Sequence, residues 1–140
     1  MQQPFNTEPT PNNEAWVRQQ YLNASYYLAE RGIVTDSVSM QESRYLPPFL
    51  AIWKLNDQQK QSYWVITGDF PTDAVATTAA KTAREAIKHF SLRWQLKAEQ
   101  LLQGAGAQDA DGQKFAEVLV RGAENLYQVA DNDQLWPEVG

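Results

Sequence analysis

Apolar residues recur at helical spacing in the first part of the chain. Asn12 or Asn13 can cap a helix that runs to about Arg31, and Gly32 supplies the left-handed residue that often ends a helix. The main apolar face of this predicted helix consists of Val17, Tyr21, Ala24 and Leu28. Further apolar residues lie off that face, namely Trp16, Leu22, Tyr26 and Tyr27. The helix is therefore expected to be apolar on more than one side.

From about residue 35 the spacing changes to a period of two, which is typical of a β-strand. Residues 35–45 are polar enough for a strand at a sheet edge, and Pro47-Pro48 should end it because proline cannot donate a ladder hydrogen bond. Residues 49–55 are apolar on both faces, and residues 63–67 are rich in aromatic and β-branched side chains. The pattern predicts a three-stranded antiparallel meander with a buried central hairpin.

A long helix is predicted after the turn at residues 68–73. It should begin near Thr77 or Thr78 and run to about Gln103, with Gly104 beyond it. Its buried stripe is expected to be Ala83, Ile87, Phe90, Trp94, Ala98 and Leu101. A smaller apolar face lies nearly opposite, at Leu92 and Leu96.

The last predicted helix covers about residues 112–130 and follows a cap at Asp109 or Asp111. Its expected core face is Phe115, Val118, Leu119, Ala123, Leu126 and Ala130. Gly122 lies within that face, where a missing side chain permits close approach of a neighbouring helix.

The order of one helix, three strands and two helices predicts the α+β class. We expect a single domain over residues 12–131, a loose N-terminal arm with three prolines at 1–11, and a tail at 132–140 with Trp136 laid on the body. Helices on one face alone would leave the other side of the hairpin exposed. Either the first helix or a second copy of the protein should cover it.

Composition narrows the classes of partner and compartment. Seventeen acidic against 12 basic residues give a net charge of −5, and the basic residues are scattered singly, so nucleic acid is disfavoured as a partner. There are no cysteines, which excludes disulfides, a thiolate nucleophile and a sulfur-based zinc site. The N-terminus lacks the features of a signal peptide, and no run approaches the ~18 apolar residues of a membrane span. We expect a cytoplasmic protein with no membrane partner.

The meander predicts one gathering of charged residues. Glu42 and Arg44 should approach the Gly68-Asp69 corner, with Asp73 close behind, because these strand ends lie together in an antiparallel arrangement. Paired carboxylates beside an arginine can bind a cation or an amine, or act as an acid–base centre. The simpler interpretation, which we favour, is that Arg44 pairs with an acid and that Asp69 or Asp73 caps the turn.

His89 is the only histidine, so histidine-based catalysis would have to use it. It lies one helical turn from both Glu85 and Arg93, and it borders the minor apolar face of the long helix. No serine motif of the G-x-S-x-G type supports a catalytic triad. A half-buried histidine at a helix or subunit contact is the favoured interpretation.

Neither a metal nor a cofactor is expected. Residues 109–112 resemble the start of a calcium loop, but Lys114 stands where that loop needs glycine and Val120 where it needs glutamate. The sequence holds neither a G-x-G-x-x-G nor a Walker motif for a nucleotide.

Three stretches of the sequence are specific enough to indicate a family. They are residues 42–54 (ESRYLPPFLAIWK), 63–73 (YWVITGDFPTD) and 84–97 (REAIKHFSLRWQLK). Together they resemble an uncharacterised family of bacterial proteins of about this length, domain of unknown function 4826. The resemblance implies a stand-alone bacterial protein and no known activity, so no functional residue is carried over from it.

Three functional hypotheses remain open at this stage. The favoured one is a non-enzymatic interaction or regulatory protein whose partner is a second copy or another protein, because both the long helix and the hairpin have two apolar faces. The second is a small hydrolase or isomerase that uses Asp69, Asp73 and Glu42 with Arg44, assisted by His89. The third is a small-molecule-binding module with an aromatic pocket near Trp94 and the hairpin tryptophans, Trp53 and Trp64, which are expected to share one face.

Overall fold

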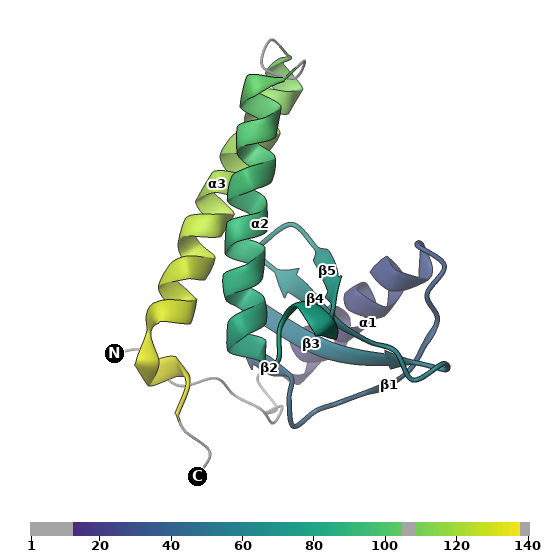
Figure 1. Ribbon diagram of the computed structural model, residues 1–140. Helices are drawn as coiled ribbons and strands as arrows, with labels where there is room; N and C mark the ends of the chain where they lie inside the picture. The colour runs from purple at the N-terminus through teal and green to yellow at the C-terminus, as the bar shows by residue number, and fades with distance from the viewer. Residues whose placement is uncertain (1–12, 105–108, 138–140) are drawn as a thin grey trace.

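The computed structural model describes residues 13–104 and 109–137, and over these residues it has three α-helices and a five-stranded antiparallel sheet (Figure 1). The helices are α1 (Glu14–Ala29), α2 (Ala83–Gln103) and α3 (Ala110–Asp131). The strands are β1 (Thr35–Val38), β2 (Arg44–Leu46), β3 (Leu50–Asp57), β4 (Ser62–Gly68) and β5 (Asp73–Ala76). Short 3₁₀ turns lie at η1 (Thr77–Ala79) and η3 (Asp133–Leu135). The predicted α+β class is confirmed, whereas the predicted N-terminal arm lies outside the described residues.

The predicted hairpin forms the centre of the sheet. β3 pairs with β4 in a regular antiparallel register from Leu50 opposite Gly68 to Asn56 opposite Ser62. β1 and β2 both pair with the other edge of β3, and β5 pairs with the outer edge of β4. The apolar runs of β3 and β4 are buried on both faces, which explains why neither strand shows simple alternation.

Helices cover both faces of the sheet, and each face has its own apolar core. On one face α1 packs against Tyr45, Ala51, Trp53, Leu55 and Val65. On the other face α2 and α3 pack against Leu50, Ile52, Trp64 and Ile66. The first helix, rather than a second copy, thus covers the second side of the hairpin, which was one of the two alternatives left open by the sequence.

α2 and α3 lie side by side and extend well past the sheet (Figure 1). They are in close contact at Gly122, where an added Cβ would lie 3.0 Å from the ring of Trp94. The role predicted for Gly122 is confirmed. We call the parts of the two helices beyond this contact the arm, defined as residues 95–103 and 110–121.

The predicted first strand is divided into two short strands, β1 and β2. Between them Ser43 turns the chain, because its hydroxyl and its N–H both donate to the carbonyl oxygen of Ser39, at 2.9 and 3.0 Å. The Ser43 hydroxyl also accepts from the N–H of Lys54 in β3, at 2.9 Å. Serine side chains that bond the backbone locally compete with a continuous ladder, which the alternating pattern alone does not reveal.

The segment after β4 also differs from the prediction. Residues 73–76, predicted to lie between a turn and a helix, form the fifth strand, and Thr77 begins a 3₁₀ turn instead of α2. α2 starts only at Ala83, where the Thr82 hydroxyl accepts from the N–H of Glu85 and caps the helix. The C-terminal end of α2 at Gln103 and the cap of α3 at Asp109 are confirmed.

The predicted burial of two residues of α3 is wrong. Phe115 and Val118 are 40% and 48% exposed, because they lie on the arm, where the sheet no longer covers the helix pair. The other predicted core positions are buried, and α3 also buries Ala116 and Val129. The tail prediction for Trp136 is confirmed, since its indole N–H donates to the carbonyl oxygen of Val129 at 3.0 Å.

Candidate functional site

Asp73 is the predicted site residue with the most specific surroundings. It begins the edge strand β5, and its side chain is only 17% exposed. Its Oδ2 accepts a hydrogen bond from the indole N–H of Trp94 at 2.9 Å, and its Oδ1 accepts one from the N–H of Ala74 at 2.8 Å. The carboxylate therefore joins the strand edge to a fully buried side chain of α2.

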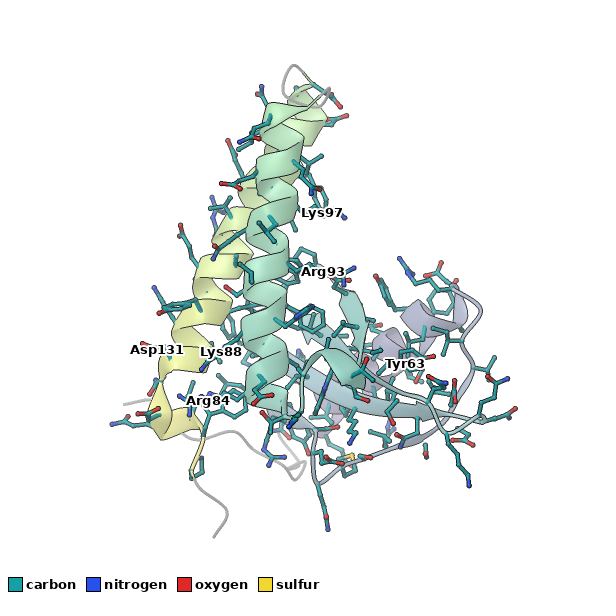
Figure 2. All side chains as sticks on the ribbon, viewed as in Figure 1. Tyr63, Arg84, Lys88, Arg93, Lys97 and Asp131 are labelled. Carbon is teal, nitrogen blue, oxygen red and sulfur yellow. The ribbon has the colours of Figure 1, made fainter. Side chains whose placement is uncertain are left out.

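Two further side chains complete the surroundings of this carboxylate. The Nε of Arg93, on the side of α2 that faces β5 (Figure 2), lies 3.5 Å from Oδ2. From α1, the Tyr27 hydroxyl donates to Oδ1 at 3.5 Å, and the guanidinium of Arg31 lies 3.5 Å from the centre of the Tyr27 ring. We call Asp73, Trp94, Arg93 and Tyr27 the Asp73 junction, because they link both helical layers around the sheet edge.

The junction perturbs one ionisable group. Burial raises the pKa of the Tyr27 hydroxyl above its usual value of 10.0, and the nearby Asp73 carboxylate raises that pKa further. The guanidinium groups of Arg31 and Arg93 act on the Tyr27 pKa in the opposite direction. Tyr27 is therefore a protonated hydrogen-bond donor at neutral pH.

This arrangement is better suited to holding the fold than to acid–base chemistry. Both carboxylate oxygens of Asp73 already accept protein N–H groups at short distance, so a substrate would have to displace them. The simpler interpretation of the sequence assigned Asp73 a local capping role, and its bond to the N–H of Ala74 is of that kind.

The other predicted charged residues do not converge on Asp73. Arg44, Ile52, Ile66 and Asp73 form one row across β2, β3, β4 and β5, so three strand spacings, about 14 Å, separate the first from the last. The prediction that Arg44 approaches this carboxylate is therefore wrong. β3 and β4 lie between the two strands that carry these residues, because β2 pairs with one edge of β3 and β4 pairs with the other.

Glu42, Arg44 and Asp69 each have separate surroundings. Arg44 donates to the carbonyl oxygens of Gln41 and Ser43, and it pairs with no acid among residues 13–104 and 109–137. Glu42 forms an ion pair with Lys54, at 2.9 Å. Asp69 is exposed, and its backbone N–H donates to the carbonyl oxygen of Phe49 at 2.9 Å. Asp69 follows β4, which lies on the opposite edge of β3 from β2, the strand that holds Arg44. A catalytic role for any of these residues stays a prediction.

His89 lies half-buried on α2, one helical turn before Arg93. It lines a shallow groove of about 420 Å³ together with Leu92, Leu96, Arg93, Lys97 and Gln100. The predicted position of His89 beside the minor apolar face is confirmed. Its catalytic role stays a prediction.

The hairpin tryptophans lie on opposite faces of the sheet. Trp53 stands opposite Val65, and Trp64 stands opposite Lys54, so the two indoles alternate across the pleat. Trp53 packs with α1, whereas Trp64 packs with α2 and α3 and donates to the carbonyl oxygen of Ala80 at 2.8 Å. The prediction that they share one face is wrong, and both are fully buried in packed clusters.

In the part of the chain that the structure describes, five of the exposed large apolar side chains lie on the arm. Its exposed members are Leu96, Leu102, Phe115, Val118 and Val120, between 37% and 51% exposed. Leu102 and Val120 line a groove of about 450 Å³ between α2 and α3, with charged side chains at its rim. Leu96 was predicted as part of a minor apolar face of the long helix, whereas the exposure of Leu102 and Val120 was not predicted. Their only signal was that they fall outside the buried stripes.

Comparisons with known proteins agree with the resemblance in the sequence. Neither the curated proteins nor the solved structures contain a match to this chain. No helix in residues 13–104 and 109–137 is long and apolar enough to cross a membrane. The sequence model of a family described as a domain of unknown function, DUF4826, matches residues 11–136, a range that includes α1, the whole sheet, α2 and α3. The chain belongs to the DUF4826 family.

Proposed function

We propose that the protein is a non-enzymatic interaction protein that associates with a second copy of itself through the arm. The observation that carries this proposal is the exposure of five large apolar side chains on the two helix ends beyond the sheet. Apolar residues scattered singly over a surface need no explanation, whereas a group on one projecting element is typical of an interface.

The burial of Leu102 and Val120 supports at most a weak and concentration-dependent association. Leu102 and Val120 are roughly half exposed, so covering them yields roughly 1 kcal/mol each in each copy. The total of about 4 kcal/mol for two copies equals the lower estimates of the entropic cost of association. The other exposed apolar side chains of the arm and ion pairs at the rim must therefore supply any net gain. A net gain of about 4 kcal/mol would correspond to a dissociation constant of about 1 mM, and the measurement has to reach that protein concentration.

The alternatives have less support in the geometry. An acid–base centre would need the four charged residues of the predicted cluster in one place, and β3 lies between Arg44 and Asp69. An aromatic pocket would need Trp53 and Trp64 on one face, and they lie on opposite faces.

Sedimentation equilibrium from 10 µM to about 1 mM tests the proposal. We expect the mean mass to rise from the 15.9 kDa of the monomer toward twice that value. The Leu102→Ser variant should remain monomeric, whereas Leu22→Ser, at a position of matched exposure on α1 (51% against 49%), should associate like the wild type. Circular dichroism verifies that both variants are folded.

Two results would contradict the proposal. A wild-type protein that stays monomeric up to 1 mM would remove self-association. Equal weakening by Leu22→Ser and Leu102→Ser would place the contact on a surface other than the arm.

A further inference from the structure

The groove between α2 and α3 on the arm has an apolar floor and a charged rim. Leu102, Ala116 and Val120 form the apolar part of its lining. Glu117, Arg121 and Glu124 also line it, and all three are exposed side chains of α3. An apolar centre with a polar rim is the usual anatomy of a protein–protein interface.

The rim charges are available for a partner. Within residues 13–104 and 109–137 the ion pairs involve other side chains, so Glu117, Arg121 and Glu124 have no opposite charge within 4.0 Å. They follow one another at intervals of four and three residues, which places them along one side of the helix. One positive charge thus stands between two negative charges beside an apolar strip.

This order of charges is complementary to itself when two helices run antiparallel. A two-fold axis that passes α3 near residue 119 places Arg121 opposite Glu117 of the second copy. An axis between residues 122 and 123 places Arg121 opposite Glu124 of the second copy. In either case symmetry forms the ion pair twice, whereas a parallel arrangement in register would place Arg121 against Arg121.

We infer that a second copy of this chain docks in this groove, with the two α3 helices antiparallel and Arg121 of each copy paired with Glu117 or Glu124 of the other. The inference rests on the proposed function and adds the surface, the orientation and the charge pairing. A groove that carries both signs of charge suits its own copy better than a strongly basic or strongly acidic partner, because such a partner would meet a like charge at the rim.

A pair of charge variants tests the docking directly. Arg121→Glu makes the rim wholly acidic, and the double variant Glu117→Arg/Glu124→Arg makes it wholly basic. Each variant alone should have a dissociation constant at least about tenfold higher than the wild type, because like charges then meet across the axis. An equimolar mixture should associate as a heterodimer, within about threefold of the wild-type constant.

A matched control carries the same exchange of charge away from the arm. Arg18 forms an exposed pair with Glu14 on α1, with 3.9 Å between charged atoms, and Arg18→Glu should leave self-association unchanged. Raising the salt concentration should weaken the wild-type dimer, because exposed ion pairs are screened.

The outcomes separate this inference from the proposed function. A wild-type protein that is monomeric at every concentration overturns the proposed function itself. If the wild type associates but the acidic and basic variants each associate equally well alone, the inference alone is overturned. A mixture of the two variants that stays monomeric also overturns it, because opposite rims then fail to recognise each other.

Discussion

Replacing Asp73 with alanine is the sharpest test of the Asp73 junction. The indole N–H of Trp94 donates to this carboxylate at 2.9 Å, and the Trp94 side chain is only 1% exposed. With alanine at position 73, the Trp94 N–H loses its acceptor in a place that water hardly reaches. A buried donor without a partner costs about 1–3 kcal/mol, and hydrogen bonds to a charged group are at the stronger end of the range.

The expected loss of stability is about 3 kcal/mol. The Trp94 bond accounts for about 2 kcal/mol of it, and the Ala74 N–H, which is half-buried at the sheet edge, for about 1 kcal/mol. The Arg93 pair adds little, because the arginine side chain is 48% exposed and screened by solvent. For 140 residues the unfolding entropy near the midpoint is about 0.3 kcal/mol/K, so Tm should fall by about 10 °C.

Urea unfolding followed by circular dichroism measures this change. Asp73→Asn keeps one acceptor oxygen and should cost less, about 1 kcal/mol. Asp69→Ala is the matched control, because that residue is exposed in the loop just before β5, and the change should alter stability by less than about 0.5 kcal/mol. In a Trp94→Phe background, where the donor is absent, Asp73→Ala should cost about 1–2 kcal/mol less than in the wild type. Equal costs for Asp73→Ala and Asp69→Ala would refute the reasoning.

Three other predictions follow from single positions. Gly68→Ala should destabilise the protein far more than Gly32→Ala in thermal unfolding. Both glycines have positive φ, +117° and +82°, but only at Gly68 would an added Cβ clash with a backbone atom, the carbonyl oxygen of Phe49. Equal effects would contradict this. Gly122→Val should lower the free energy of unfolding by about 2 kcal/mol in urea, because its Cβ would lie 3.0 Å from the buried Trp94 ring. An unchanged urea midpoint would show that the two helices can move apart at no cost. Titration at 295 nm, with Tyr27→Phe as reference, should place the Tyr27 pKa above 10, and Asp73→Asn should lower it. Because the Tyr27 pKa is raised in the folded state, the stability that this group contributes is complete below pH 10.0 and is lost as the pH rises through the folded-state pKa. A Tyr27 pKa that does not change in Asp73→Asn would be inconsistent with the Asp73 junction.

The elements of this protein follow largely from its local sequence. The periodic stripe from Ala83 to Leu101 predicted α2 and its C-terminal end, and Gly32 predicted the end of α1. The end of α1 has a local cause, since Gly32 takes φ +82° and the N–H of Ile33 returns to the carbonyl oxygen of Leu28 at 2.9 Å. Caps, glycines and helical periodicity act over a few residues, so the sequence carries them without knowledge of the fold.

Strand boundaries were less predictable than helices, because neighbouring strands decide them. The segment from Thr35 to Tyr45 alternates like one strand, yet the chain turns at Ser43 and pairs twice with the same edge of β3. Residues 73–76 show little strand character of their own and form β5 only by pairing with β4. A short edge strand forms because its backbone hydrogen-bonds to a neighbouring strand, and the residues of that neighbour lie elsewhere in the sequence.

The candidate sites depended most on tertiary structure. The register of β3 against β4 decides that Trp53 and Trp64 lie on opposite faces, and a shift by one residue would reverse the face of each side chain along a strand. The placement of β2 and β4 on opposite edges of β3 separates Arg44 from Asp69. Neither choice is encoded within the segments themselves.

Sequence alone determined that there are three helices and about where each one ends, which two strands are central, and the roles of Gly32 and Gly122. Tertiary structure alone decided that Asp73 joins both helical layers and that Phe115 and Val118 are exposed although they continue a core stripe. The physical reason is that periodicity defines the apolar side of a helix, whereas burial depends on whether another layer reaches that point along its length. The sheet of this protein does not extend as far as the arm, so it cannot cover Phe115 and Val118.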